Sequence, residues 1–261
     1  MTRTSGSAGG AGRITLSANL LLVGLIFNGL GFAIGGDLLD GAGAAFVFVM
    51  AGWVLGLCLH AFGPLLVSGN PGLPGTGGLA TGGLATGVLA IDPARAPNPV
   101  ATMLLPVVFT ILVGLGFPGG VSEAEAAGPS RGRRSAVAAA GPAMSLLFLI
   151  LLVGLYALTS DESGTLRAVL AVSVLFQGTA LVLGLMPVPG LDGYAILRPW
   201  LPGDWSWTDR VARHSALVLL GLFLLSGAFT RPVFRVSLRL TAGLGIDLAD
   251  VITGYRLIRL W

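Results

Sequence analysis

Three clusters of polar or turn-forming residues interrupt the apolar sequence and hold the side chains that could do chemistry. The first, at 57–64, contains His60; the second lies at 140–145; the third, at 186–193, contains Asp192. Imidazole and carboxylate groups can take up and release protons. Because an ionisable group in apolar surroundings is costly, it faces the protein interior and marks a candidate functional site. His60 and Asp192 are therefore the first candidates.

The composition of the chain excludes a soluble domain. Of 261 residues, 54% are hydrophobic and 10% are charged, whereas soluble domains carry about 25% charged residues. The mean hydropathy is +0.87, and disordered chains have low hydrophobicity. The 41 glycines do not recur at every third position, as collagen requires. The chain is expected to be an all-α polytopic membrane protein.

Long apolar stretches predict the membrane segments, because a helix needs about 20 mostly apolar residues to cross a bilayer. We expect a polar N-terminal segment at 1–13, a membrane domain of five to six segments at 14–230, and an amphipathic interfacial tail at 231–261. The first apolar stretch is too long for a cleavable signal peptide and is expected to remain as a span. The predicted segments are 14–35, 43–67, 100–117, 137–158, 166–186 and the shorter 215–229.

A stretch rich in Gly and Pro, at 68–99, lies between the second and third predicted segments. It contains a tandem repeat of Gly-Gly-Leu-Ala-Thr at 77–81 and 82–86. Two repeats are too few for a solenoid. The turn residues and their β-branched neighbours predict a short hairpin or an irregular loop, for which guiding a substrate is one functional interpretation.

In their order along the chain, the three clusters resemble the motifs of the site-2 protease family of intramembrane zinc metalloproteases. That family carries HExxH on one transmembrane helix, Gly-Pro-x-x-Asn on a later one, and Asn-x-x-Pro-x-Pro-x-Leu-Asp-Gly beyond it. The resemblance covers about residues 43–200 and implies a site-2 protease-like helical bundle. It implies metal ligands at His60 and Asp192, and substrate-binding residues at Gly141, Pro142, Ser145, Pro187, Pro189 and Gly193.

The likeness breaks at the residues that perform hydrolysis. In HExxH the two histidines bind zinc and the glutamate acts as general base. Here the base position is Ala61, the second histidine position is Pro64, and the Asn positions hold Ser145 and Gly184. The two ligands left are fewer than the three of a catalytic zinc, and loss of the base alone slows proton transfer about 10²- to 10⁴-fold. We expect a degenerate site with no catalytic residue and at most weak zinc binding.

Other reactive side chains do not obviously replace the missing groups. His214 lies beside two arginines at a predicted membrane edge, and Glu123 and Glu125 fall in a polar loop. Cys58 precedes His60 by two positions, so on a helix it points to a different face. We expect Cys58 to pack in the interior.

Pro64 is expected to disturb the helix that carries His60. A proline inside a helix cannot donate a hydrogen bond to the carbonyl four residues earlier, at a cost of about 3 kcal/mol. The carbonyl concerned belongs to His60. The sequence predicts that the helix bends or ends there.

Topology gives a test of the resemblance. For His60 and Asp192 to meet, the segments 43–67 and 166–186 have to end on the same membrane side. Since consecutive crossings alternate, one of the two intervening segments does not cross fully. The segment 100–117 is short, contains Pro106 and ends in glycines, so we expect it to be re-entrant or broken. We also expect 215–229 to cross only partly.

The charges predict the orientation of the chain. All 15 basic residues are arginines, and under this topology most of them, with the N-terminus, lie on the motif side. Because cytoplasmic loops collect arginine, the motif side is expected to face the cytoplasm. In these positions the arginines orient a membrane protein and do not indicate nucleic-acid binding.

Three functions compete. The first is a pseudoprotease that no longer cuts and binds transmembrane helices or a membrane partner through its interior. The second is an active intramembrane metallopeptidase that uses substitute residues. The third is a small transporter or channel-like protein, which also employs re-entrant segments and buried ionisable residues. Taken singly, the prolines, Gly193 and Asp192 could also do no more than end one helix and begin the next.

Overall fold

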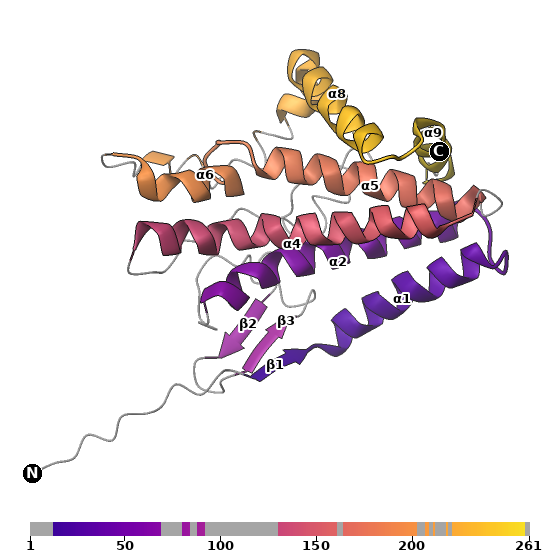
Figure 1. Cartoon of the computed structure of the whole chain (residues 1–261), viewed down its shortest axis with the longest axis horizontal. Helices are drawn as coiled ribbons and strands as arrows, with labels where there is room; N and C mark the ends of the chain where they lie inside the picture. The colour runs from indigo at the N-terminus through magenta and orange to yellow at the C-terminus, as the bar shows by residue number, and fades with distance from the viewer. Residues whose placement is uncertain are drawn as a thin grey trace, which may run out of the picture.

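Four long helices form the body of the protein in the computed structural model (Figure 1). They are α1 (Ala18–Gly35), α2 (Ala42–Ser68), α4 (Arg131–Leu158) and α5 (Gly164–Gly184). Each is long and apolar enough to cross a membrane, which confirms the all-α membrane fold. The structure describes residues 13–68, 80–83, 88–91, 130–160, 164–202, 207–208, 211, 218 and 221–258.

Contacts at the helix ends fix the directions in which the helices run. At one end of the bundle, Arg133 near the start of α4 donates to the carbonyl of Ser68 at the end of α2, at 3.3 Å. At the other end, Arg167 near the start of α5 donates to the carbonyl of Thr159, just after α4, at 3.0 Å. Consequently α2 and α5 end at the same end of the bundle, as the topology argument requires. The prediction for 100–117 lies outside the described residues, as do His214, Glu123 and Glu125.

The first helix starts later than predicted, because residues 13–16 form strand β1 (Arg13–Leu16). Ser17 has an extended backbone, and its hydroxyl accepts a hydrogen bond from the Leu20 amide at 3.1 Å. This is a helix N-cap, so the boundary is set by Ser17 rather than by the beginning of the apolar run.

A small three-stranded sheet accompanies the helices. β2 (Ala80–Gly83) and β3 (Val88–Ile91) pair antiparallel, with Ala80 opposite Ile91, which confirms the hairpin interpretation of the Gly-rich stretch. β1 adds to β3 in parallel, giving the order β1-β3-β2. The sequence did not predict this third strand, since its partner is far away in the chain.

Pro64 does not end its helix. α2 continues to Ser68 with Pro64 inside it, so the alternative in which the helix stops at His60 is wrong. The neighbouring Gly63 lies directly against the backbone of α4 at Ala140. Close packing against a second helix holds this turn of α2 in place despite the missing hydrogen bond.

The C-terminal part of the described chain forms α8 (Gly227–Gly243) and α9 (Leu248–Ile258). Both contact α5, and Val251 and Gly254 of α9 are buried. Gly254 lies against the carbonyl of Ala168 in α5. The tail thus helps to enclose α5, and its placement in the membrane interface stays a prediction. Of the segment 215–229, the structure describes 218 and 221–229, and α8 begins inside it at Gly227; its partial crossing stays a prediction.

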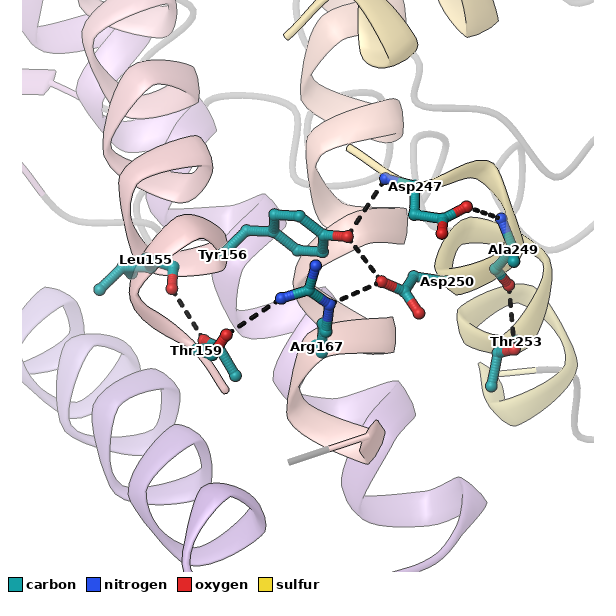
Figure 2. A network of polar contacts seen from close by, with 8 residues as sticks. All are labelled: Leu155, Tyr156, Thr159, Arg167, Asp247, Ala249, Asp250 and Thr253. Atoms are coloured by element: carbon teal, nitrogen blue, oxygen red, sulfur yellow. Dashed lines mark hydrogen bonds and ion pairs between the residues drawn. The ribbon is translucent and has the colours of Figure 1, made fainter. Parts of the chain in front are cut away.

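A polar network joins the tail to the bundle (Figure 2). The carboxylate of Asp250 accepts hydrogen bonds from the Tyr156 hydroxyl at 2.6 Å and from Arg167 Nε at 2.9 Å. The guanidinium of Arg167 lies 4.3 Å from the centre of the Tyr156 ring. The Asp247 amide in turn donates to the Tyr156 hydroxyl at 3.1 Å. These bonds connect α4, α5 and α9 at the end of the bundle where α5 begins.

Candidate functional site

A cavity of about 30 Å³ lies between the helices near the end where α2 and α5 finish. It has room for about two water molecules. Positions three and four residues apart on a helix share one face, and α2, α4 and α5 line the cavity with such positions. The lining residues are Trp53, Gly56, Leu57 and His60 of α2, Pro142 and Ser145 of α4, Gln177, Ala180 and Leu181 of α5, and Asp192.

His60 is the centre of the polar groups in this cavity. Its Nε2 atom lies 3.3 Å from Oδ1 of Asp192, and its Nδ1 atom lies 3.0 Å from Oγ of Ser145. The side chains of His60 and Asp192 are 25% and 11% exposed. A neutral ring that carries its proton on Nε2 donates to Asp192 and accepts from Ser145, whereas a charged ring donates to both. Both ring nitrogens therefore have protein partners.

Asp192 is positioned by the turn that follows α5. It is the first residue of α6 (Asp192–Leu197). Gly190 has φ of +94°, in the left-handed region that favours glycine. Gly193 lies against the carbonyls of Leu185 and Met186, where a side chain would collide with the backbone. The Leu-Asp-Gly sequence therefore folds a tight turn that directs Asp192 toward His60.

The structure brings some of the predicted site residues together and leaves others apart. Gly141 lies beside the His60 ring, because a Cβ atom there would be 2.9 Å from Nε2. Pro142 and Ser145 line the cavity. Pro187 and Pro189 lie in the turn between α5 and α6 and are not among the lining residues; Gly193 acts on Asp192 through the backbone.

The two departures from the motif show no replacement within the described residues. Ala61 is buried beside Cys58, and neither Ala61 nor Pro64 lines the cavity. In that part of the chain, no group of three or more His, Cys, Asp or Glu side chains could hold a metal ion. Since a catalytic zinc takes three protein ligands, the donor pair of His60 and Asp192 does not fit one.

Two polar residues of the cavity, Trp53 and Gln177, were missed by the sequence analysis as site residues. Trp53 is 3% exposed and Gln177 is 6% exposed. Gln177 is the one glutamine of the chain and lies inside an apolar segment. A buried amide in an apolar helix is a signal that could have identified it.

Three curated proteins are similar to most of the chain. One, from Mycolicibacterium smegmatis, is 32% identical over 223 residues, covering 83% of this chain and 81% of the relative. Two from Mycobacterium tuberculosis are 34% identical over 220 residues, covering 83% and 81% (strain H37Rv), and 36% identical over 197 residues, covering 72% of each (strain Erdman). All three are named "Putative zinc metalloprotease Rip2". No family model and no solved structure matches the chain.

Proposed function

The chain belongs to the site-2 protease family through its Rip2 relatives, and on that premise we propose that it is a membrane pseudoprotease. It keeps the family's helical scaffold and binds transmembrane segments of partner proteins in its interior, without zinc-dependent hydrolysis.

The observation that carries this proposal is the composition of the site. The position of the general base is Ala61 and that of a third ligand is Pro64. The donor set of the described residues is limited to His60 and Asp192. Peptide hydrolysis on zinc needs a held metal ion and a group that removes a proton from water. Because the metal ligands are reduced in number and the proton-accepting group is missing, binding is the function that the scaffold still supports.

What remains of the site suits binding. The cavity keeps polar groups on α2, α4, α5 and α6, among apolar side chains such as Leu57 and Leu181. The hydrogen bond that His60 donates to Asp192 and the one that it shares with Ser145 hold its ring in one orientation. A transmembrane segment that enters the bundle would find a preorganised polar surface there.

The test combines metal analysis with a cleavage assay. We expect the purified parent protein to contain zinc well below one ion per molecule and to leave a reconstituted transmembrane substrate intact. The double variant Ala61→Glu/Pro64→His, which restores both missing groups, is expected to bring zinc close to one per molecule. One zinc per parent molecule together with cleavage would reject the proposal.

An active peptidase with substitute residues is the second candidate, and it rests on the proximity of His60 and Asp192, whose Nε2 and Oδ1 atoms lie 3.3 Å apart. The names of the relatives also fit this candidate. It predicts that His60→Ala and Asp192→Ala each abolish a measurable cleavage, with the exposed Asp40→Ala as the matched control.

We further propose that the end of the bundle that carries the site faces the cytoplasm. Arg131, Arg133 and Arg134 begin α4 at this end and are exposed, and cytoplasmic loops collect arginine. A cysteine placed at Arg131 is expected to escape a membrane-impermeant thiol reagent in intact cells, whereas one at Asp40, at the other end, is expected to react. The reverse pattern would invert the orientation.

A further inference from the structure

The inner part of the cavity is lined by two polar side chains, Trp53 and Gln177, that make no side-chain hydrogen bond to the described residues. Nε1 of Trp53 is buried and finds no hydrogen-bond acceptor in the part of the chain that the structure describes. Gln177 also lines the cavity, and within that part its amide makes no hydrogen bond. Buried polar groups are nearly always paired in folded proteins, and leaving them unpaired is costly. These two groups therefore indicate a ligand.

The packing around Gln177 shows that space is kept for its side chain. Its amide lies over Gly56 of α2, where a Cβ atom would be 2.5 Å from Nε2. Any other residue at Gly56 would displace the amide. Trp53, Gly56 and His60 follow one face of α2, so the polar lining extends about 10 Å along the helix from His60 toward its start.

The chemistry of the pair matches a peptide group. The indole of Trp53 is a donor only, and the amide of Gln177 offers two donors and an acceptor. A backbone carbonyl can accept from both residues, while a backbone N–H can donate to the carbonyl oxygen of Gln177. In an intact transmembrane helix these backbone groups are already bonded within the helix. Only an unwound stretch presents them.

We propose that Trp53 and Gln177 form a backbone-recognition subsite, which binds one peptide group from an unwound stretch of a transmembrane segment that docks against the cavity. The inference rests on the proposed function and deepens it, because it names what the interior recognises. It also explains why an apolar helix keeps an amide at this position. Ser145 does not compete for this role, since its hydroxyl is engaged by His60.

The test measures binding of two labelled transmembrane peptides to the full chain in lipid nanodiscs by energy transfer. One peptide carries a central Gly-Pro, which leaves backbone groups of its helix unbonded; the other is an uninterrupted Leu-Ala helix. The variants are Gln177→Leu and Trp53→Phe, which remove the hydrogen-bonding groups and keep apolar volume. Thr179→Val is the matched control, because Thr179 is buried in the same helix and bonds the Leu175 carbonyl.

We expect the parent to prefer the interrupted peptide, and each subsite variant to bind that peptide about 3- to 10-fold more weakly. Binding of the uninterrupted peptide and the behaviour of Thr179→Val are expected to stay unchanged. Because Trp53 belongs to the core, the thermal midpoint of each variant is recorded, and a loss of binding counts only where folding is retained. If Trp53→Phe is unstable, Gln177→Leu alone decides the test, because it removes an amide that makes no hydrogen bond to the described residues.

The outcomes separate the two proposals. Equal binding of the interrupted peptide by the parent, Gln177→Leu and Trp53→Phe would overturn the subsite alone and leave ordered water as the occupant of the cavity. Failure of the parent to bind either peptide would overturn the proposed function and the subsite with it.

Discussion

Two polar clusters lie at opposite ends of the same helices and differ in how completely their groups are paired. The tail network consists of Tyr156, Arg167 and Asp250, and each of its groups has a bonded partner. The cavity cluster consists of Trp53, His60, Ser145, Gln177 and Asp192. In this second cluster the Trp53 N–H has no acceptor among the described residues.

The difference separates a structural role from a binding role. A closed network satisfies its own hydrogen-bonding groups and so stabilises one arrangement of helices. An open cluster keeps unsatisfied groups at a cost in stability, which folding alone does not explain. The tail network therefore has the character of a structural contact that holds α9 against the bundle. The cavity cluster has the character of a ligand-binding site. The four predictions below test this distinction.

The largest effect is expected from Asp250→Ala. It removes the shared acceptor of Tyr156 and Arg167, and with it the carboxylate that balances the charge of the Arg167 side chain, which is only 22% exposed. We expect a loss of about 2–3 kcal/mol in the free energy of unfolding, measured by denaturant titration in detergent. The exposed Asp40→Ala is the control. If Asp250→Ala and Asp40→Ala lower the free energy of unfolding equally, the Asp250 network does not hold α9 against the bundle.

A smaller loss is expected from Gly193→Ala. The new methyl group would collide with the carbonyls of Leu185 and Met186, so the turn has to shift at a cost of about 1–3 kcal/mol. The shift moves Asp192 away from His60. Gly154→Ala is the control, because nothing lies within 4 Å of its Cβ position, and alanine favours a helix over glycine. The two substitutions are expected to change unfolding free energy with opposite signs.

Sequence reasoning predicted the cavity cluster better than the tail network. The order of the motifs and the alternation of crossings required the ends of α2 and α5 to coincide, and the structure places His60 and Asp192 3.3 Å apart there. The pair of Arg167 and Asp250 is separated by 83 positions, and no motif relates the two residues. A pattern of charges on an amphipathic tail does not specify which cation it will meet.

The other differences between the predictions from the sequence and the structure also arise from contacts between residues far apart in the chain. The predicted first span includes residues of strand β1, because a parallel partner far away in the chain leaves no local pattern in the sequence. Gln177 was overlooked because a single amide in an apolar helix can point to any face, and only the packing over Gly56 shows which one. Local patterns specify the elements, while contacts between distant residues decide which polar groups meet.

The coupling between paired groups is expected to be weaker in the cavity than in the tail network. The bond from His60 to Asp192 is 3.3 Å long and borders a cavity, whereas that from Arg167 to Asp250 is 2.9 Å long. Double-mutant cycles with alanine are expected to give about 0.5–1 kcal/mol for the cavity pair and about 1.5–2 kcal/mol for the tail pair. A larger value for the cavity pair would mean that it, too, is mainly structural.

The smallest expected effect is a gain in stability from Gln177→Leu in the absence of any bound peptide. Leucine has a similar volume and leaves no buried amide without a partner, so we expect the free energy of unfolding to rise by about 1 kcal/mol. Ser173→Ala is the matched control on the same helix, because its hydroxyl already bonds the Val169 carbonyl. No gain is expected there.

The sign of the change in unfolding free energy caused by Gln177→Leu decides whether the two clusters differ in role. A polar residue that folding requires destabilises the protein when it is removed, as is expected for Asp250. A polar residue kept for a ligand stabilises the free protein when it is removed and weakens binding at the same time. If Gln177→Leu lowers the free energy of unfolding, its amide contributes to folding, and the contrast between the two clusters disappears.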